Sequence, residues 1–117
     1  MFLHHIAVIV SKEESLEFYK ELGFIEISRQ IRPSHHDVLI WMEGNGIRLE
    51  VFVDSTHPAR VSNPEAYGLR HIAFEVDDLE AERNRLSKYN PEPIREDFRF
   101  FFVKDLDGCP IEIREKR

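Results

Sequence analysis

One eight-residue segment of this chain occurs twice, and the repeat limits the possible folds more than any other feature. Leu3–Val10 reads LHHIAVIV and Leu69–Val76 reads LRHIAFEV, so the leucine, the His-Ile-Ala core and the final valine keep their order. A second, shorter repeat closes each half, Arg48–Val51 (RLEV) and Pro110–Ile113 (PIEI). Recurrence at nearly constant spacing indicates two copies of one supersecondary unit.

The residue patterns predict the order β-α-β-β-β in each half. Short β-rich runs with period two predict strands. Ser11 and Asp77, each followed three residues later by a glutamate, are typical helix N-caps. The first half is expected to have strands at 5–10, 24–30, 37–43 and 47–53 around a helix over 11–22. The second is expected to have strands at 69–76, 94–96, 98–103 and 109–114 around a helix over 77–89. Residues 54–68, which include Pro58 and Pro64, are expected to link the two.

Composition narrows the classes of function. The formal net charge is −6 and the basic residues are scattered, which argues against nucleic acid or an anionic membrane as the main partner. The single cysteine, Cys109, excludes an intrachain disulfide and is typical of a reducing compartment. No signal peptide is recognisable, and no apolar run approaches the ~18 residues of a membrane span. A cytoplasmic location is therefore expected.

Both repeats contain residues that can bind a metal. Period two places each of these residues on the strand face opposite the aliphatic side chains, and pseudo-symmetry would bring the matching faces together. Two imidazoles and two carboxylates suit one divalent ion, Ni²⁺, Co²⁺, Zn²⁺, Fe²⁺ or Mn²⁺. An octahedral ion would keep two positions for water or substrate. The four candidates are His5, Glu50, His71 and Glu112.

Each of the four candidates has an ordinary alternative explanation. A single histidine on a strand is more often a packed or exposed residue than a ligand, and a single glutamate usually lies on a solvated face. These alternatives do not require histidine and glutamate at equivalent positions of both repeats. The symmetric recurrence therefore favours a metal site.

Longer segments resemble a known family. Leu3–Val10, Phe18–Phe24, Gly68–Asp78 and Asp105–Glu112 are similar to the glyoxalase/bleomycin-resistance/extradiol-dioxygenase family, also called vicinal oxygen chelate. The resemblance covers essentially the whole chain. Pro64–His71 and residues 99–102 resemble most a short bacterial glyoxalase-I-like subgroup, the YaeR/YwkD type. The family's usual Asp-Pro-Asp-Gly turn is Asp-Leu-Asp-Gly in this chain.

The resemblance implies a fold and a metal site. The fold would be α+β, one glyoxalase-like domain over 1–117, whose modules at about 1–57 and 68–117 form a curved sheet around a metal cleft. His5, Glu50, His71 and Glu112 match the family's four metal positions. The family usually pairs modules within or between chains, and each module leaves sheet edges and an apolar face, so a homodimer is expected.

The resemblance also implies a reaction. The substrate would be a hemithioacetal formed from a thiol and a 2-oxoaldehyde such as methylglyoxal, as for lactoylglutathione lyase. A base would move the carbon-bound proton to the neighbouring carbon while the metal stabilises the enediolate. By family analogy the base is Glu112, and Glu50 is the symmetric alternative.

Two rival functions stay open. One is a protein that binds a small molecule or antibiotic without turnover, which an intact quartet disfavours. The other keeps the metal but transfers a thiol or adds oxygen, which the second carboxylate disfavours.

Other residues are weaker candidates for function. His35-His36-Asp37 has a metal-like composition but is expected to be exposed. Trp41 is a candidate pocket wall, and Arg48 and Arg95 could each bind a substrate carboxylate. Phe98, Phe100 and Phe102 are expected on one strand face, as core, interface or pocket. Cys109 is expected to be inert.

Overall fold

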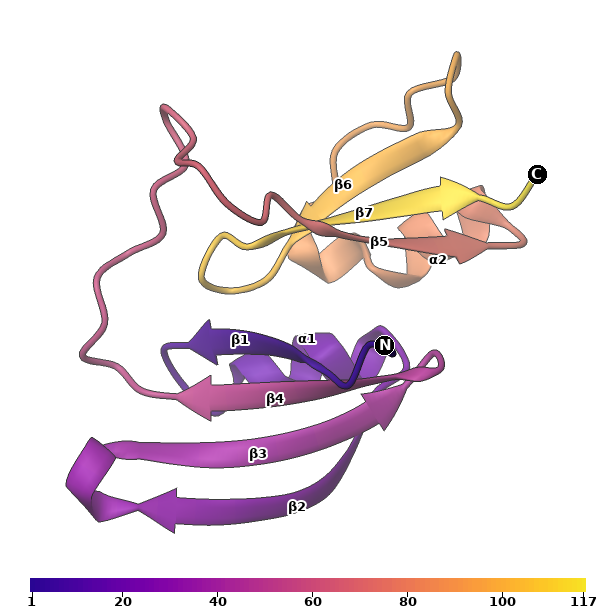
Figure 1. Cartoon of the computed structure of the whole chain (residues 1–117). Coiled ribbons are helices and arrows are strands. Elements are labelled where there is room, and N and C mark those ends of the chain that lie inside the picture. Colours follow the sequence, from indigo (N-terminus) through magenta and orange to yellow (C-terminus); the bar gives the residue numbers. More distant parts are fainter. The chain divides into compact units, whose positions relative to one another are not determined.

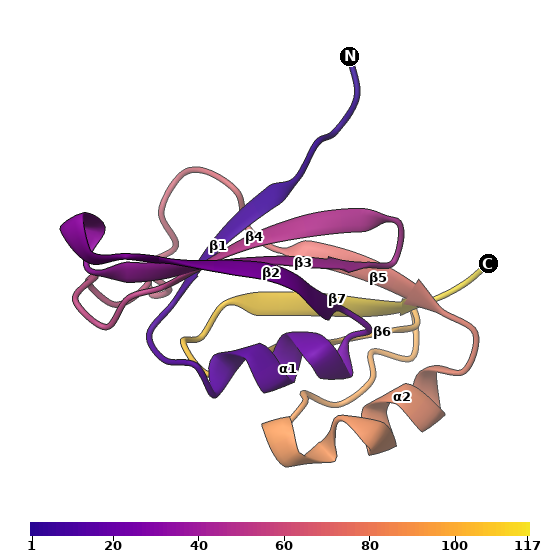
Figure 2. The same cartoon turned by 90° about the horizontal axis from the view of Figure 1, so that it is seen from below.

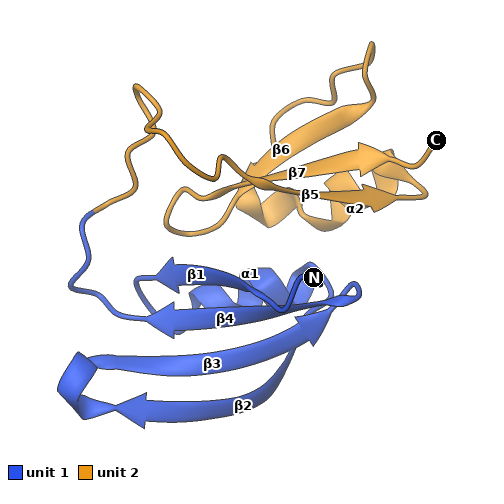
Figure 3. Ribbon diagram, viewed as in Figure 1, with its two compact units in different colours: residues 1–58 blue, residues 59–117 orange.

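The computed structural model describes residues 1–117 as two compact units, Met1–Pro58 and Ala59–Arg117 (Figure 3). Each unit is a small sheet with a short helix, so the molecule is of mixed α+β class, as predicted. No helix is long and apolar enough to cross a membrane.

Unit 1 has the predicted order β-α-β-β-β (Figure 1). Its sheet has the strand order β1-β4-β3-β2, in which β1 and β4 are parallel and the other pairs antiparallel. A 3₁₀ turn, η1, joins β2 to β3. The bounds are β1 Ile6–Val10, α1 Ser15–Glu21, β2 Ile25–Arg32, η1 Pro33–His35, β3 Asp37–Gly44 and β4 Ile47–Val53.

The core of unit 1 lies between α1 and one face of the sheet (Figure 2). The apolar residues of α1 are buried because they recur on one side of the helix. Alternate residues of β3 and β4 are buried against them. The buried side chains include Leu16, Phe18, Tyr19, Phe24, Ile40, Met42, Leu49 and Val51. The opposite face of the sheet is left free to carry Glu50.

The turn between β3 and β4 requires glycine at Gly44. A Cβ there would lie 2.2 Å from the Gly23 carbonyl oxygen, so only glycine permits this approach of two backbones. Asn45 and Gly46 both have positive φ, and the Asn45 side chain donates to the Leu22 carbonyl at 2.9 Å. The turn thereby fixes the register of the strand that holds Glu50.

Unit 2 repeats this pattern with one strand fewer. Its sheet has the order β5-β7-β6, with β5 parallel to β7 and β6 antiparallel to β7. A 3₁₀ turn, η2, follows the helix. The bounds are β5 Ile72–Val76, α2 Leu79–Arg85, η2 Ser87–Tyr89, β6 Phe100–Lys104 and β7 Pro110–Glu115. The core again lies on the helix side, with Leu79, Leu86, Phe101, Val103, Ile111 and Ile113 buried.

The strand predicted over 94–96 is wrong. Only an isolated bridge between Arg95 and Phe100 occupies its place. Pro91 and Pro93 have no N–H to donate, so a continuous ladder cannot form. Two separate bonds remain, from the Glu92 N–H to the Phe102 carbonyl and from the Arg95 N–H to the Phe100 carbonyl. The next strand also begins later than predicted, at Phe100.

Both predicted helix caps are displaced. α1 begins at Ser15, and its N-cap residue Glu14 makes no side-chain cap bond, so the Ser11 cap is wrong. The preceding residues instead form a turn, with the Ser15 N–H donating to the Lys12 carbonyl. In α2 the cap is Asp78 rather than Asp77, and its carboxylate accepts from the Ala81 N–H at 3.0 Å. Asp77 and Asp78 are adjacent carboxylates that can each cap a helix, and the structure uses Asp78.

Candidate metal centre

Unit 1 brings His5 and Glu50 together. His5 lies immediately before β1, and Glu50 lies in the middle of β4, the parallel neighbour of β1. The Nε2 atom of His5 is 3.4 Å from the Oε1 atom of Glu50. Both side chains are part-buried. The alternation predicted for β4 is confirmed, since Leu49 and Val51 point into the core and Glu50 points away.

Unit 2 brings His71 and Glu112 together in the same way. His71 immediately precedes β5, and Glu112 lies in β7, the parallel neighbour of β5. The His71 Nε2 atom is also 3.4 Å from the Glu112 Oε1 atom. The four candidates thus occur as two pairs, one in each unit, with the same atoms at the same separation. In neither unit does a further histidine, cysteine or carboxylate complete a group of three.

The separation within each pair fits two ligands of one ion. At 3.4 Å a nitrogen and an oxygen are too far apart for a good hydrogen bond, which spans ~2.7–3.2 Å. Ligand atoms ~2.0–2.2 Å from a shared metal lie roughly 2.8–3.1 Å apart at octahedral angles and roughly 3.3–3.6 Å apart at tetrahedral angles, so the observed separation matches the tetrahedral range. Imidazole and carboxylate donors suit a borderline divalent cation. The residues present therefore fit the metal that the sequence predicts.

An aromatic ring stands edge-on to each histidine. Trp41 lies directly across from Glu50 on β3, with its ring centroid 5.0 Å from that of His5 at 84°. Phe102 lies directly across from Glu112 on β6, with its centroid 5.0 Å from that of His71 at 85°. Trp41, predicted as a pocket wall, also lines a small hollow on the unit 1 sheet together with Ser28 and Arg48. A ring on this side shields the imidazole from water and limits its rotation.

The Nδ1 atoms of the two histidines differ in their surroundings. His5 Nδ1 lies 2.7 Å from His4 Nδ1, so a proton on one ring can be donated to the other. A proton on His5 Nδ1 would leave Nε2 free to bind a metal. His71 Nδ1 is buried and has no hydrogen-bond partner. The difference follows from the residue before each histidine, which is His4 in the first repeat and Arg70 in the second.

The two glutamates also differ. Glu112 Oε2 accepts a hydrogen bond from Arg114 Nη1 at 2.8 Å, while its Oε1 faces His71. Glu50 has no such partner on its own strand, because Phe52 stands two residues after it and Arg48, two residues before it, is bound to Glu43. Sequence reasoning missed Arg114. Its position two residues after Glu112, on the same strand face, was the available signal.

The remaining candidates lie outside the pairs. Asp37 accepts two bonds of 2.7 Å from Arg32, and these bonds hold the pKa of the Asp37 carboxyl below its usual value. His35 and His36 are exposed. Arg48 is bound to Glu43 at 2.8 Å, so its charge is already paired. Phe98 precedes β6 and is exposed, which corrects its predicted place in the strand.

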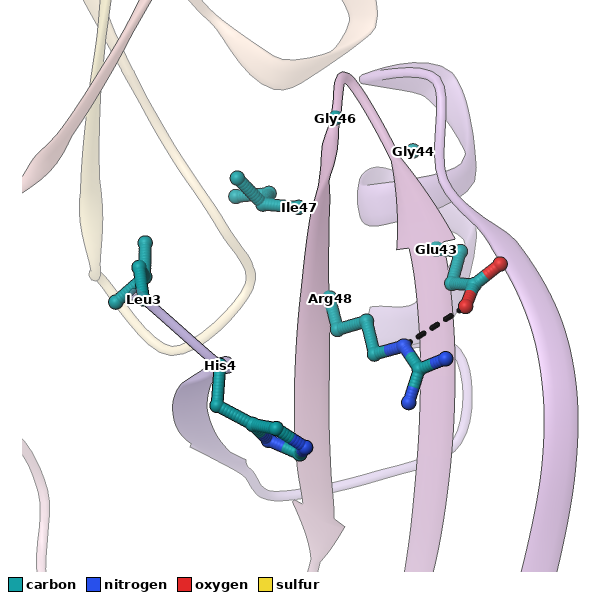
Figure 4. A pocket seen from close by; sticks show the side chains of 7 residues that line it. All are labelled: Leu3, His4, Glu43, Gly44, Gly46, Ile47 and Arg48. Carbon is teal, nitrogen blue, oxygen red and sulfur yellow. Dashed lines mark hydrogen bonds and ion pairs between the residues drawn. The ribbon is translucent and has the colours of Figure 1, made fainter. Parts of the chain in front are cut away.

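A hollow of about 500 Å³ lies in unit 1 beside the turn between β3 and β4 (Figure 4). Its volume is in the usual range for small-molecule sites. The Glu43–Arg48 ion pair crosses one wall, so the two charges largely cancel. Neither His5 nor Glu50 lines it, so the hollow is separate from the unit 1 pair. The lining residues are Leu3, His4, Glu43, Gly44, Gly46, Ile47 and Arg48.

The chain belongs to the Glyoxalase/Bleomycin resistance protein/Dioxygenase superfamily, whose pattern matches residues 4–107. It is 40% identical to the protein YaeR of Escherichia coli (strain K12), over 97% of this chain and 95% of that protein. It is 38% identical to YwkD of Bacillus subtilis (strain 168), over 97% of this chain and 96% of that protein. Both relatives are named as uncharacterized, so they establish the family and not a reaction.

Solved structures agree with this assignment. A glyoxalase family protein from Enterococcus faecalis superposes with a TM-score of 0.86 at 33% identity, over 96% of this chain and 95% of that one. Two more distant structures share the fold alone. One is glyoxalase I of Leishmania major, with a TM-score of 0.78 at 24% identity and coverage of 98% and 86%. The other is Listeria monocytogenes FosX in a complex with Mn(II), with a TM-score of 0.77 at 18% identity and coverage of 97% and 90%.

Proposed function

We propose that this protein is a metal-dependent, glyoxalase-I-like lyase that isomerises a thiol hemithioacetal of a 2-oxoaldehyde. The observation that carries the proposal is the repetition of one His–Glu pair, with the same 3.4 Å separation, in both units. This repetition disfavours a protein that binds a small molecule without a metal. The fold shared with glyoxalase I and with FosX supports a metalloenzyme of this superfamily.

The two pairs would hold one divalent ion, either from one chain or from two copies. His5, Glu50, His71 and Glu112 would be its ligands, and Ni²⁺, Co²⁺, Zn²⁺, Fe²⁺ and Mn²⁺ all suit this donor set. When bound, such an ion supplies a Lewis acid that stabilises negative charge developing on the substrate oxygens. Trp41 and Phe102 would exclude water beside the two imidazoles.

One glutamate must also move a proton. The base takes the proton from the substrate carbon that carries the sulfur and returns it to the neighbouring carbonyl carbon. The hydroxyl proton of the first carbon passes to the former carbonyl oxygen, so the product is a 2-hydroxy thioester with the same atoms as the substrate. The Oε2 atom of Glu112 is held by a 2.8 Å hydrogen bond from Arg114, while its Oε1 atom lies 3.4 Å from His71. No hydrogen bond from an arginine holds Glu50, although the Arg32 charge acts on it at longer range, so Glu50 can swing toward the substrate at lower cost. We therefore assign the base to Glu50 and a fixed ligand role to Glu112, which reverses the order that family analogy favours.

A homodimer is part of the proposal. β2 is the edge strand of the unit 1 sheet, and it carries three exposed isoleucines, Ile25, Ile27 and Ile31. An exposed apolar edge strand is a site for pairing with another chain. A monomer by light scattering at micromolar concentration would contradict the dimer.

The test is turnover of hemithioacetals by protein of known metal content. Protein purified without chelator is mixed with methylglyoxal and a panel of thiols, and product formation is followed before and after metal removal. Activity is expected to disappear with the metal and to return when it is restored. His71→Gln is expected to abolish it, whereas His57→Gln, outside both pairs, is the matched control. No turnover with any thiol would overturn the lyase and favour the runner-up, a small-molecule or antibiotic resistance protein.

A further inference from the structure

A row of rings and guanidinium groups continues from His71 and Glu112 along the unit 2 sheet. The Phe102 ring, which stands edge-on to His71, is itself 5.8 Å from the Phe100 ring. Phe100 lies between two arginines. On one side it pairs with Arg114 of β7, and on the other it pairs with Arg95 through the isolated bridge. Both guanidinium carbons lie 5.6 Å from the centre of the Phe100 ring.

Arg95 differs from the other arginines within the folded part of unit 2 because no oxygen accepts a hydrogen bond from its guanidinium. Apart from the C-terminal Arg117, every other arginine donates a hydrogen bond to a carboxylate or to a backbone carbonyl. The guanidinium of Arg95 has only the Phe100 ring. A guanidinium has five N–H donors in a fixed fork that matches a carboxylate, and a ring face satisfies none of them as hydrogen bonds.

None of the neighbouring acidic side chains forms an ion pair with Arg95. Glu112 is bonded to Arg114, and Glu96 is bonded to Arg99. Asp97 accepts from the Phe98 N–H. Glu75 lies opposite Arg114 on β5, on the far side of that arginine from Arg95. The positive charge at the outer end of the row is therefore not neutralised by an ion pair.

We propose that Arg95 binds a carboxylate of the substrate, with Phe100 as the apolar floor beneath the part that joins this carboxylate to the reacting atoms. Phe100 and Arg114 lie two residues along their strands from Phe102 and Glu112, which is about 7 Å. Arg95 is two strand spacings of ~4.8 Å across from Arg114, so its backbone lies roughly 12 Å from that of Glu112, and the two long side chains narrow the gap that the substrate must span. This assignment rests on the proposed function for its substrate but predicts a binding preference that needs no turnover.

A pair of probes that differ in one charge tests the site. Calorimetry would measure the binding of 3-phenylpropionate and of 3-phenylpropanamide, which share the ring and the chain length. The carboxylate is expected to bind about tenfold more tightly, as a charge-assisted hydrogen bond allows. Arg95→Gln should reduce this preference to within about twofold, and Arg95→Lys should keep part of it. Arg48→Gln, which removes an arginine already paired with Glu43, should leave it unchanged.

Turnover separates this inference from the proposed function. Hemithioacetals of methylglyoxal with 3-mercaptopropionate and with 3-mercaptopropanamide form the matched substrate pair. A carboxylate preference that depends on Arg95, found without turnover of either compound, supports the anion site and overturns the lyase. Equal turnover of both compounds that Arg95→Gln does not change supports the lyase and overturns the anion site. A carboxylate preference that survives in Arg95→Gln also overturns it.

Discussion

Each unit contains a histidine, a glutamate and an aromatic ring in the same arrangement, but the residues that neighbour this group differ between the units. In each, a histidine before the first strand faces a glutamate at 3.4 Å, and an aromatic ring stands 5.0 Å from the imidazole. Two residues after the glutamate, unit 1 has Phe52 and unit 2 has Arg114. In unit 1 the arginine over that phenylalanine, Arg32, is neutralised by Asp37.

The comparison suggests a division of labour. Where matching positions hold the same kind of residue, the shared task that we propose is to bind the metal. Where they differ, unit 2 has one glutamate fixed by Arg114 and one arginine, Arg95, without an acidic partner. Unit 1 has a glutamate free of such a clamp. We infer that unit 1 supplies the moving base and that unit 2 supplies the fixed ligand and the anion contact.

The largest expected effect comes from exchanging each glutamate for glutamine. Glu50→Gln should lower turnover per bound metal by ~10²–10⁴, which is the usual value of general-base catalysis, with a smaller change in metal affinity. Glu112→Gln should mainly lower metal affinity. The measurement is the rate divided by the metal content. If Glu112→Gln abolishes turnover per metal while Glu50→Gln keeps it, the two roles are the reverse of those assigned.

Removing the clamp should have an intermediate effect. Arg114→Gln is expected to weaken metal binding ~10–100-fold, because groups that orient a ligand usually contribute that much. Arg114→Lys should recover part of the loss, whereas Phe52→Leu, at the matching position, should change metal affinity little. A competition titration against a metal indicator measures all three. Equal effects of Arg114→Gln and Phe52→Leu would remove the asymmetry on which the comparison depends.

The ion pair of unit 1 predicts a small dependence of stability on pH. Hydrogen bonds from Arg32 lower the pKa of Asp37 in the folded protein. The stabilisation is therefore present above the ordinary aspartate pKa, ~3.9, and is lost as the pH falls through the lowered value. Asp37→Asn should flatten this acidic part of the stability curve without changing the rest. Denaturant titrations from pH 7 to pH 3 would check it, and an unchanged acid dependence would contradict it.

The smallest effect is expected where the units are equivalent. Trp41→Phe places in unit 1 the residue that unit 2 already has beside its histidine, and metal affinity should stay within about threefold. Trp41→Ala leaves His5 without its neighbouring ring and should weaken binding further. A large loss in Trp41→Phe would show that the two rings are not interchangeable.

Much of the fold was predictable because the pattern is local. The repeated His-Ile-Ala strands, the alternation around Glu50 and the Gly44–Gly46 turn each reflect contacts between near neighbours or along one strand. The predictions failed where neighbouring residues decide the structure, as prolines do beside a short strand and as two adjacent aspartates do at a helix N-cap. Pro91 and Pro93, which lack an N–H, directly precede the segment 94–96, and only an isolated bridge at Arg95 forms there; Asp78 caps α2 in place of Asp77.

The site was predictable in part for the same reason. Repetition identified His5, Glu50, His71 and Glu112, and the structure groups them as two pairs. Their metal-binding role stays a prediction. Repetition could not reveal features that only one unit has. The Arg114 clamp, the His4–His5 contact and the unpaired guanidinium of Arg95 depend on side-chain positions that no repeat encodes.

Metal stoichiometry tests the central claim most directly, because it asks whether the two pairs act as one site. Protein loaded with Mn²⁺ or Ni²⁺ and freed of excess ion would be analysed for metal per chain, together with His5→Ala and His71→Ala. We predict one ion per chain in the wild type, and loss of that ion in both variants alike. Two ions per chain, or a variant that keeps its ion after either histidine is removed, would contradict a shared metal centre.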